Sequence, residues 1–478
     1  MGTSFRAKLS NLLLVLVDLI LLNAAYAAAF WIRYSGEITG GMRLVRDNVD
    51  PYFTLLPLLN AGAVVIFYFF DLYSDWRRKN VHSLLYSVVL SVILLNLLIV
   101  AASFWIRAFA FPRSVILLAF VLQVIFLVAG RLAVWKLGKS IFGKKKVLIV
   151  GTDLENGVQI ADKFLRHSEG WFVIGDFVFE NDRDRLHRKL QQVDVVVLSP
   201  NLSEARKAEI ISACIRWGKE ALVVPNLYEL FVLKSEPQQI DDMLVFSIQP
   251  PRLTAGQRFV KRLFDIVVSL LLLIVLSPVM LALAAAIPLT SRGGAIYKQE
   301  RLGLDEKPYY IYKFRSMVQD AERRSGPVLA SADDPRITPV GRFIRATRLD
   351  ELPQLFNVLK GDMSLVGPRP EREFFIDRFK ETMPDYAYRM TVKPGMTGLA
   401  QVMAKYSTTP EDKLRFDLMY VRNYSFSLDL KILFQTLRVV LQGEQAEGVR
   451  RDRKDARERA LKLFGLKELD TAMQGSDD

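Results

Sequence analysis

Residues 263–289 read LFDIVVSLLLLIVLSPVMLALAAAIPL, an apolar run with one charged residue, Asp265, near its start and Ser277-Pro278 in its middle. The run is longer than the roughly 20 residues that a helix needs to cross 30 Å of hydrocarbon. Proline removes a backbone hydrogen bond and clashes with the preceding turn, so we expect a kink at Ser277-Pro278. Basic residues flank the run on both sides, and a fifth span would place the basic remainder of the chain outside the cell. We therefore expect a re-entrant helix hairpin over residues 263–290 that enters and leaves on the cytoplasmic face, with a fifth span as the alternative.

Four further apolar runs precede this segment, and each approaches or exceeds the length of a membrane-spanning helix. They cover about Leu9–Ile32, Pro51–Phe70, Leu84–Trp105 and Ser114–Trp135. A cleaved signal peptide would explain the first run but not the other three. Lysine and arginine favour the amino end and the connections after the second and fourth runs, among them Arg77–Lys79 and Lys144–Lys146. We expect residues 1–140 to form a four-helix transmembrane bundle with both ends on the cytoplasmic side.

Residues 141–250 alternate between strand-like and helix-like patterns. Buried-strand runs at Val147–Val150 and Val193–Leu198 are separated by helix-like segments, which predicts a cytoplasmic Rossmann-like α/β module with a parallel sheet. The first turn spaces its glycines as G-x-x-x-x-x-G from Gly151, and Asp153 stands where a dinucleotide fingerprint has its second glycine. A structural or regulatory module is therefore expected in preference to a dinucleotide site.

Charge and composition narrow the classes of function. The chain of 478 residues carries 64 Lys and Arg against 51 Asp and Glu, a formal net charge of +13, which favours an anionic partner. With 51% hydrophobic residues it is too apolar for an ordinary soluble nucleic-acid binder, so a membrane surface is expected and no nucleic acid. One cysteine and three scattered histidines exclude a disulfide scaffold and a cysteine zinc module, and argue against a histidine metal cluster. Chemistry must come from carboxylates, hydroxyls and basic groups.

Residues 296–442 concentrate such groups around one pair of adjacent carboxylates, Asp350 and Glu351. The cations stand in the segments Tyr312-Lys-Phe-Arg-Ser-Met317, Gly341-Arg-Phe-Ile-Arg345 and Val366-Gly-Pro-Arg-Pro370. Arginine forks suit phosphate oxygens, and carboxylates can bind a divalent cation or attack phosphorus. The residues alone predict a phosphate-handling site at a bilayer surface, with ordinary surface salt bridges as the alternative.

A set of motifs in this half closely resembles the bacterial sugar transferases, the polyprenyl-phosphate hexose-1-phosphate transferases also called monotopic phosphoglycosyl transferases. The motifs are Lys261-Arg-Leu-Phe-Asp265, Tyr312-Lys-Phe-Arg-Ser-Met317, Asp350-Glu-Leu-Pro-Gln354, Asn357-Val-Leu-Lys-Gly-Asp-Met-Ser364, Gly367-Pro-Arg-Pro370 and Lys393-Pro-Gly-Met-Thr-Gly398. The resemblance covers about residues 258–442, and the bundle and α/β module ahead of it resemble the long form of the family. It implies an α/β catalytic domain over 251–442, which would leave 443–478 as a charged C-terminal tail.

The resemblance also implies an activity. The family transfers a hexose-1-phosphate from a UDP-sugar, here expected to be UDP-glucose or UDP-galactose, to undecaprenyl phosphate and releases UMP. This is the first membrane step of exopolysaccharide, capsule or O-antigen synthesis. The expected place is the bacterial inner membrane, in contact with its lipids, and a homodimer is compatible with a membrane bundle.

The same resemblance assigns roles to single residues. Asp350 would be the nucleophile that forms a covalent aspartyl phosphosugar, and Glu351 would help to hold Mg²⁺. Ser277-Pro278 matches the break in the family's membrane hairpin. The expected substrate-binding residues are Lys313, Arg315, Arg345, Pro368 and Arg369.

Several of these residues also fit other interpretations. An alternative role for Asp350 and Glu351 is to cap a helix that opens at Leu352-Pro353, since acids favour the first turn. Pro368-Arg369-Pro370 would serve as a scaffold turn, and Lys313 as a side chain that extends towards lipid. Tyr309-Tyr-Ile-Tyr-Lys313 matches the Y-x-x-x-K spacing of short-chain dehydrogenases, which suggests a membrane-anchored nucleotide-sugar dehydratase as a rival enzyme. A non-catalytic scaffold for polysaccharide assembly is the second rival.

Overall fold

The chain divides into two compact units with the boundary between Val224 and Pro225. The computed structural model describes residues 2–35, 42–74, 81–106, 112–167, 171–233, 235–248, 253–319, 334–404 and 408–442. The expected charged tail, 443–478, and the basic connection Arg77–Lys79 lie outside the described residues. Each unit is described by itself.

The first unit begins with four long helices that cover the four predicted apolar runs. They are α1 (Gly2–Tyr34), α2 (Met42–Phe69), α3 (Val81–Trp105) and α4 (Arg113–Phe142). Each contains a segment long and apolar enough to cross a membrane. The prediction of four apolar helices in this region is confirmed, and together with α9 of the second unit they fit a membrane protein.

Polar side chains inside this bundle pair with one another. Asp18 of α1 forms a buried ion pair with Arg131 of α4. Asn96 of α3 donates to the side-chain oxygen of Gln123 of α4 at 2.7 Å. Polar groups that face hydrocarbon have no water to bind, so such pairs fix which helices are neighbours.

A parallel sheet follows, as the alternating pattern predicts. Its elements are β1 (Lys145–Gly151), α5 (Leu154–His167), β2 (Phe172–Phe179), α6 (Arg183–Leu190), β3 (Val195–Leu198), α7 (Glu204–Arg216) and β4 (Glu220–Val223). The strand order is β2-β1-β3-β4 and every pairing is parallel. Val147 to Val150 are fully buried, because helices cover both faces of such a sheet and leave its strands apolar throughout.

The turn after β1 is filled by the chain's own side chains. Asp153 accepts a hydrogen bond from the Asn156 amide at 2.7 Å, so a carboxylate already occupies the first turn of α5. A Cβ on Gly157 would lie 2.4 Å from the Phe177 ring, so this glycine is needed for the ring of β2 to pack against the helix. Both contacts favour a structural role for the turn.

The second unit is a mixed α/β domain. Its elements are α8 (Leu227–Val232), β5 (Glu236–Ile240), β6 (Met243–Ser247), α9 (Ala255–Thr290), β7 (Ile296–Leu302), β8 (Pro308–Phe314), α10 (Pro339–Ala346), α11 (Gln354–Lys360), β9 (Ser364–Val366), α12 (Glu373–Thr382), β10 (Gly395–Thr397), α13 (Leu399–Met403), α14 (Pro410–Arg422) and α15 (Phe426–Gln442). Strands β7 and β8 form an antiparallel pair, as do β5 and β6, whereas β9 and β10 are parallel. The buried core lies between α9, α11, α13, α14, α15 and the strands β8, β9 and β10.

The boundary between the units falls earlier than the expected one at residue 250. Arginines of α14 hold the connecting segment: Arg415 donates to the Pro225 carbonyl at 2.9 Å, and Arg422 donates to the Phe231 carbonyl at 2.8 Å. These contacts attach residues 225–233 to the C-terminal unit, a long-range pairing that local sequence patterns do not reveal.

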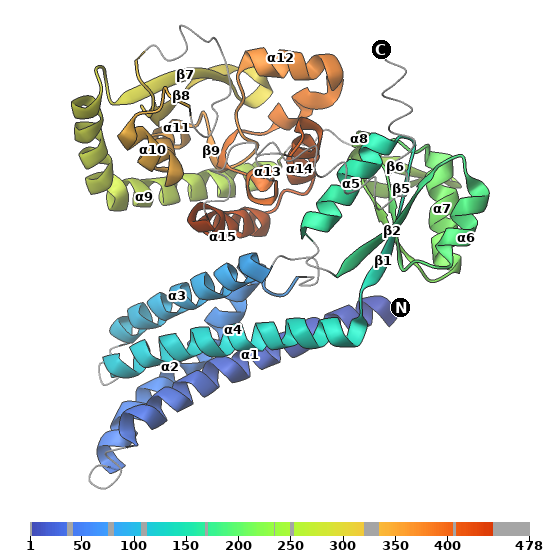
Figure 1. Ribbon diagram of the computed structural model, residues 1–478. Helices are drawn as coiled ribbons and strands as arrows, with labels where there is room; N and C mark the ends of the chain where they lie inside the picture. Colours follow the sequence, from blue (N-terminus) through green and yellow to red (C-terminus); the bar gives the residue numbers. More distant parts are fainter. Residues whose placement is uncertain are drawn as a thin grey trace. The chain divides into compact units, whose positions relative to one another are not determined.

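Helix α9 carries the apolar run of residues 263–289. Figure 1 shows that it changes direction along its length, and Pro278 stands inside it. Ser277 Oγ donates to the Ile274 carbonyl at 2.8 Å. Much of the helix remains uncovered: the side chains of Leu271 and Ile274 are 59% and 64% exposed. An exposed apolar surface of this length is expected to lie in lipid.

Candidate active site

Asp350 and Glu351 lie on a single 3₁₀ turn, Leu349–Glu351, between α10 and α11. Arg348 precedes the turn with φ of 58°, in the left-handed region, and so reverses the chain sharply. Helix α11 begins after Pro353 without a side-chain hydrogen bond at its amino end. The two acids thus lie on the 3₁₀ turn that precedes the amino end of α11.

Two cations converge on Glu351. Lys313 Nζ and Arg369 Nη2 lie 2.9 Å and 3.0 Å from the same oxygen, Oε1. The Glu351 side chain is only 13% exposed. Burial alone would raise its pKa, but Lys313, Arg369 and Arg348 outweigh burial and hold the pKa well below its usual value. Glu351 is thus a fixed negative charge, and Lys313 points to it and not to lipid.

Asp350 is in the opposite condition. Burial first, and then the adjacent charge of Glu351, raise the pKa of Asp350 to about 6 against the opposing charges of Lys313, Arg348 and Arg345. Within residues 253–319, 334–404 and 408–442, no side chain forms a hydrogen bond or ion pair with its carboxylate. One carboxylate of the pair is held by cations and the other is left unengaged.

Strand β8 brings Lys313 to the dyad because Asn357 fixes the strand against α11. The buried Asn357 side chain donates to the Tyr310 carbonyl at 2.7 Å and accepts from the Tyr312 amide at 3.0 Å. Successive side chains of a strand point to opposite faces, so Lys313 faces the dyad while Tyr312 points away. Asn357 belongs to a motif of the resemblance, and here it has a structural role.

A rigid turn presents Arg369. The Gly367 amide donates to the Thr397 carbonyl at 2.8 Å, and the Gly395 amide donates to the Pro368 carbonyl at 2.9 Å. A Cβ on Gly367 would lie 2.3 Å from a backbone oxygen of the segment before β10, so only glycine permits this approach. The Pro368-Arg369-Pro370 turn is therefore a scaffold that also delivers a cation to Glu351.

A buried ion pair supports the same turn from behind. Arg389 donates to Asp417 at 2.8 Å and to the Arg369 carbonyl at 2.8 Å. Burial disfavours the charged form of both side chains, and the attraction between the two opposite charges compensates for it. Neither residue was among the predicted site residues, because 28 positions separate them and no local motif links them.

The two remaining predicted arginines behave differently from each other. Arg345, in the last turn of α10, lies close enough for its charge to lower the pKa of Asp350. Arg315 is buried and directed away from the dyad: its guanidinium donates to the backbone carbonyls of Ser291 and Arg292, at the carboxyl end of α9. The structure thus gives Arg315 a helix-end role that its motif did not suggest. Arg348, which sequence reasoning missed, stands two residues before the dyad and acts on both carboxylates.

The Y-x-x-x-K match does not form an acid/base pair. Tyr309 and Lys313 lie four residues apart on the extended strand β8, which separates their Cα atoms by roughly 13 Å. The geometry expected of a dehydratase is absent from this segment.

The dyad offers few ligands for a metal. Among the described residues, no group of three or more His, Cys, Asp or Glu side chains could hold an ion. Mg²⁺ commonly uses one or two carboxylates and completes its shell with water and substrate phosphates. Lys313 and Arg369 both donate to Oε1 of Glu351. Glu351 therefore fits a Mg²⁺ site in which water and the substrate supply the other ligands.

The sequence is similar to known transferases. A family model described as "Bacterial sugar transferase" matches residues 256–443. The UDP-N-acetylgalactosamine-undecaprenyl-phosphate N-acetylgalactosaminephosphotransferase of Aeromonas hydrophila is 46% identical over 39% of this chain and 44% of its own length. The UDP-glucose:undecaprenyl-phosphate glucose-1-phosphate transferase of Klebsiella pneumoniae is 41% identical over 45% and 47%. These matches span about half the length of the relatives, whereas the UDP-galactose-lipid carrier transferase of Erwinia amylovora is 31% identical over 93% of this chain and 98% of its own. Because that match extends over nearly the whole of both chains, this protein belongs to the bacterial sugar transferase family, in its long form.

Proposed function

We propose that this protein transfers a hexose-1-phosphate from a UDP-sugar to undecaprenyl phosphate and releases UMP. The observation that carries the proposal is the unequal dyad, in which Asp350 is free to react while Glu351 is fixed by Lys313 and Arg369. The relatives' names support the substrate classes: they specify glucose, galactose or N-acetylgalactosamine donors and the undecaprenyl-phosphate acceptor. UDP-glucose and UDP-galactose are the first donors to test.

Two displacements at phosphorus account for the transfer. A carboxylate oxygen of Asp350 attacks the phosphorus that bears the sugar, a new oxygen–phosphorus bond forms, and UMP leaves with the electrons of the broken diphosphate bond. A phosphate oxygen of undecaprenyl phosphate then attacks the same phosphorus, and the Asp350 carboxylate departs. An aspartyl phosphosugar lies between the two steps, which predicts ping-pong kinetics.

The cations around the dyad supply the electrostatics. Lys313 and Arg369 orient Glu351, and Arg345 and Arg348 add positive potential where the diphosphate must bind. Glu351 would hold Mg²⁺, which when bound neutralises charge on the diphosphate and on the leaving UMP. A pKa of about 6 leaves Asp350 mostly ionised at neutral pH but more basic than an ordinary aspartate.

The exposed apolar surface of α9 supports a place for this reaction. In this proposal α9 enters and leaves the cytoplasmic face of the inner membrane, with its break at Ser277-Pro278, and brings the dyad to the level of a lipid phosphate. The reaction would be the first membrane step of exopolysaccharide, capsule or O-antigen synthesis.

The test is release of UMP from UDP-glucose, UDP-galactose and UDP-N-acetylgalactosamine, with and without undecaprenyl phosphate and Mg²⁺. We expect release from one donor that depends on the lipid. Asp350→Asn removes the nucleophile at almost unchanged shape and should lower the rate by at least about 10³-fold.

The matched control is Asp377→Asn, the same substitution at an exposed position of α12, which should leave the rate unchanged. Full activity in Asp350→Asn would refute the assigned nucleophile. No release from any donor by folded wild-type protein would refute the proposed reaction and favour the scaffold interpretation.

A further inference from the structure

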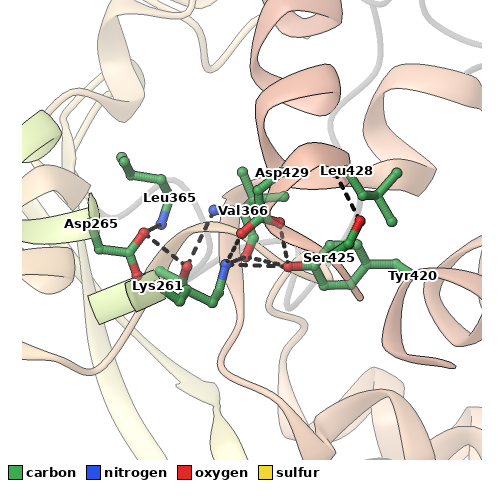
Figure 2. A network of polar contacts seen from close by, with 9 residues as sticks. Lys261, Asp265, Leu365, Val366, Tyr420, Ser425, Leu428 and Asp429 are labelled. Atoms are coloured by element: carbon green, nitrogen blue, oxygen red, sulfur yellow. Dashed lines mark hydrogen bonds and ion pairs between the residues drawn. The ribbon is translucent and has the colours of Figure 1, made fainter. Parts of the chain in front are cut away.

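Two residues of α9 enter the core of the second unit. Lys261 and Asp265 lie one helical turn apart, and both residues are nearly inaccessible, with 7% and 3% of their surface exposed. Lys261 Nζ lies 2.6 Å from a carboxylate oxygen of Asp429 on α15 and 3.0 Å from the Val366 carbonyl of β9 (Figure 2). A membrane-exposed helix therefore makes a charged contact deep inside the catalytic unit.

Asp265 binds the same strand one residue earlier. Its Oδ1 accepts from the Leu365 amide at 3.1 Å and from Ser364 Oγ at 3.1 Å. Figure 2 shows α9 holding consecutive residues of β9 in this way, through the amide of Leu365 and the carbonyl of Val366. The register between α9 and β9 is thereby fixed by charge-assisted hydrogen bonds, which are stronger than neutral ones.

Tyr420 of α14 completes the network. Its hydroxyl donates to the Val366 carbonyl at 3.1 Å or to Asp429 Oδ1 at 2.8 Å, and Lys261 Nζ lies 3.3 Å from it. A buried charge that loses its partner is costly, so the members of such a network hold one another in place.

The strand held by this network leads directly to an active-site residue. Val366 is followed by the Gly367-Pro368-Arg369 turn, and Arg369 reaches Glu351 at 3.0 Å. Arg389 and the β10 backbone hold the turn from its other sides. The Val366 carbonyl, which accepts a hydrogen bond from Lys261 of α9, directly precedes the turn.

We infer that Lys261 and Asp265 are positioning residues that set the placement of Arg369 on Glu351 by locking β9 to the membrane helix α9. Neither residue touches the substrate in this inference; both act through the backbone of residues 364–366. The inference rests on the proposed function only in that transfer activity is one of its two readouts.

A double-mutant cycle in the full-length protein in lipid nanodiscs tests the relay. Lys261→Met should lower kcat for UMP release by about 10- to 100-fold, with the KM for the UDP-sugar changed by less than about twofold. In an Arg369→Met background the same change should cause no further loss, because its route of action is already gone. Losses that multiply independently would overturn the inference.

Three other variants separate positioning from general stability. Lys261→Arg retains the charge and should restore part of the lost kcat, and Tyr420→Phe removes one contact to Val366 at nearly unchanged volume and should show a smaller loss of the same kind. Leu230→Ala truncates a buried side chain of α8 and should lower the melting temperature without lowering kcat. An equal loss of kcat in Leu230→Ala would overturn the inference.

Amide hydrogen exchange over residues 364–370 supplies a readout that needs no activity. Exchange should rise in Lys261→Met and Tyr420→Phe and stay as in wild type in Leu230→Ala. Unchanged exchange in both network variants would overturn the inference, even in an active protein. If the wild-type protein releases no UMP but the variants show the expected changes in exchange, the proposed function is refuted and the positioning network remains supported.

Discussion

Asp350 and Glu351 show how two identical functional groups, adjacent in sequence, can become chemically different. Lys313 and Arg369 both bind one oxygen of Glu351, which fixes its negative charge. That fixed charge, together with burial, makes a second negative charge beside it unfavourable and raises the pKa of Asp350 to about 6. When one proton is present on the pair it therefore belongs to Asp350, while Glu351 stays ionised and able to bind a cation.

This division of the proton predicts selective chemical labelling without metal or substrate. A water-soluble carbodiimide with a trapping amine modifies protonated carboxyl groups, so Asp350 should be labelled at pH 6, where about half of it is protonated. An ordinary aspartate is only about 1% protonated at that pH. The labelling is carried out in EDTA and measured by mass spectrometry of peptides. The labelled fraction of Asp350 should fall as the pH rises from 5 to 7, with a midpoint near 6.

The other carboxyl group of the dyad provides the control for that experiment. Glu351 should resist modification throughout, because cations hold its pKa down. If Glu351 were labelled with a midpoint near 6 and Asp350 were not labelled, the proton would belong to Glu351 and the prediction would be wrong.

At the residue scale, the sequence predicted the groups that belong to short motifs and missed those defined by distant partners. Asp350, Glu351, Lys313 and Arg369 were found because their motifs could be compared with a family, and the structure brings them together. Arg315 stands in an equally specific motif, yet its donors serve the end of α9. Partners of the buried cations lie far away in sequence: Lys261 and Asp429 are 168 positions apart, and Arg389 and Asp417 are 28 apart.

At the element scale, helix α9 combines two functions that usually belong to different segments. Lys261 and Asp265, in its amino-terminal half, bind the core of the second unit, whereas the residues around Ile274 and beyond expose apolar surface. The apolar run in the sequence predicted a helix over these residues, and Pro278 predicted that the helix would bend. The short 3₁₀ turn that carries the dyad has no periodic pattern, so its geometry could not be predicted from sequence.

The course of α9 through the membrane can be tested with the two glycines near its ends. A Cβ at Gly256 or at Gly294 would have no other part of the structure within 4 Å, so we expect both positions to tolerate cysteine. The native Cys214 is buried and can be removed as Cys214→Ser. In a re-entrant arrangement, Gly256→Cys and Gly294→Cys should both react with an impermeant maleimide in inside-out vesicles and neither in intact spheroplasts.

A spanning α9 would give the opposite pattern, with one cysteine labelled from each side. Pro278→Ala in each cysteine background shows whether the bend determines the outcome. Proline costs about 3 kcal/mol in a helix interior, so its removal should favour a straighter helix and shift part of the protein to the two-sided pattern.

At the scale of the whole molecule, the groups proposed for catalysis lie in one of the two compact units. The dyad, its cations and α9 all belong to residues 225–442, and the family match covers 256–443.

The division predicts that the two units can be separated without loss of the reaction. A protease site inserted between Val224 and Pro225 allows both parts to fold in one chain before they are cut in the membrane. We expect UMP release to stay within about twofold after cleavage, because every group placed at the dyad remains in the C-terminal fragment.

That fragment should also stay with the membrane after an alkaline wash, because the exposed apolar side chains of α9 would otherwise meet water. The uncut insertion variant is the control for damage at the junction, where Arg415 binds the Pro225 carbonyl. If the uncut variant is active and cleavage abolishes release, the bundle and the parallel sheet are required for catalysis and the second unit is not an independent enzyme.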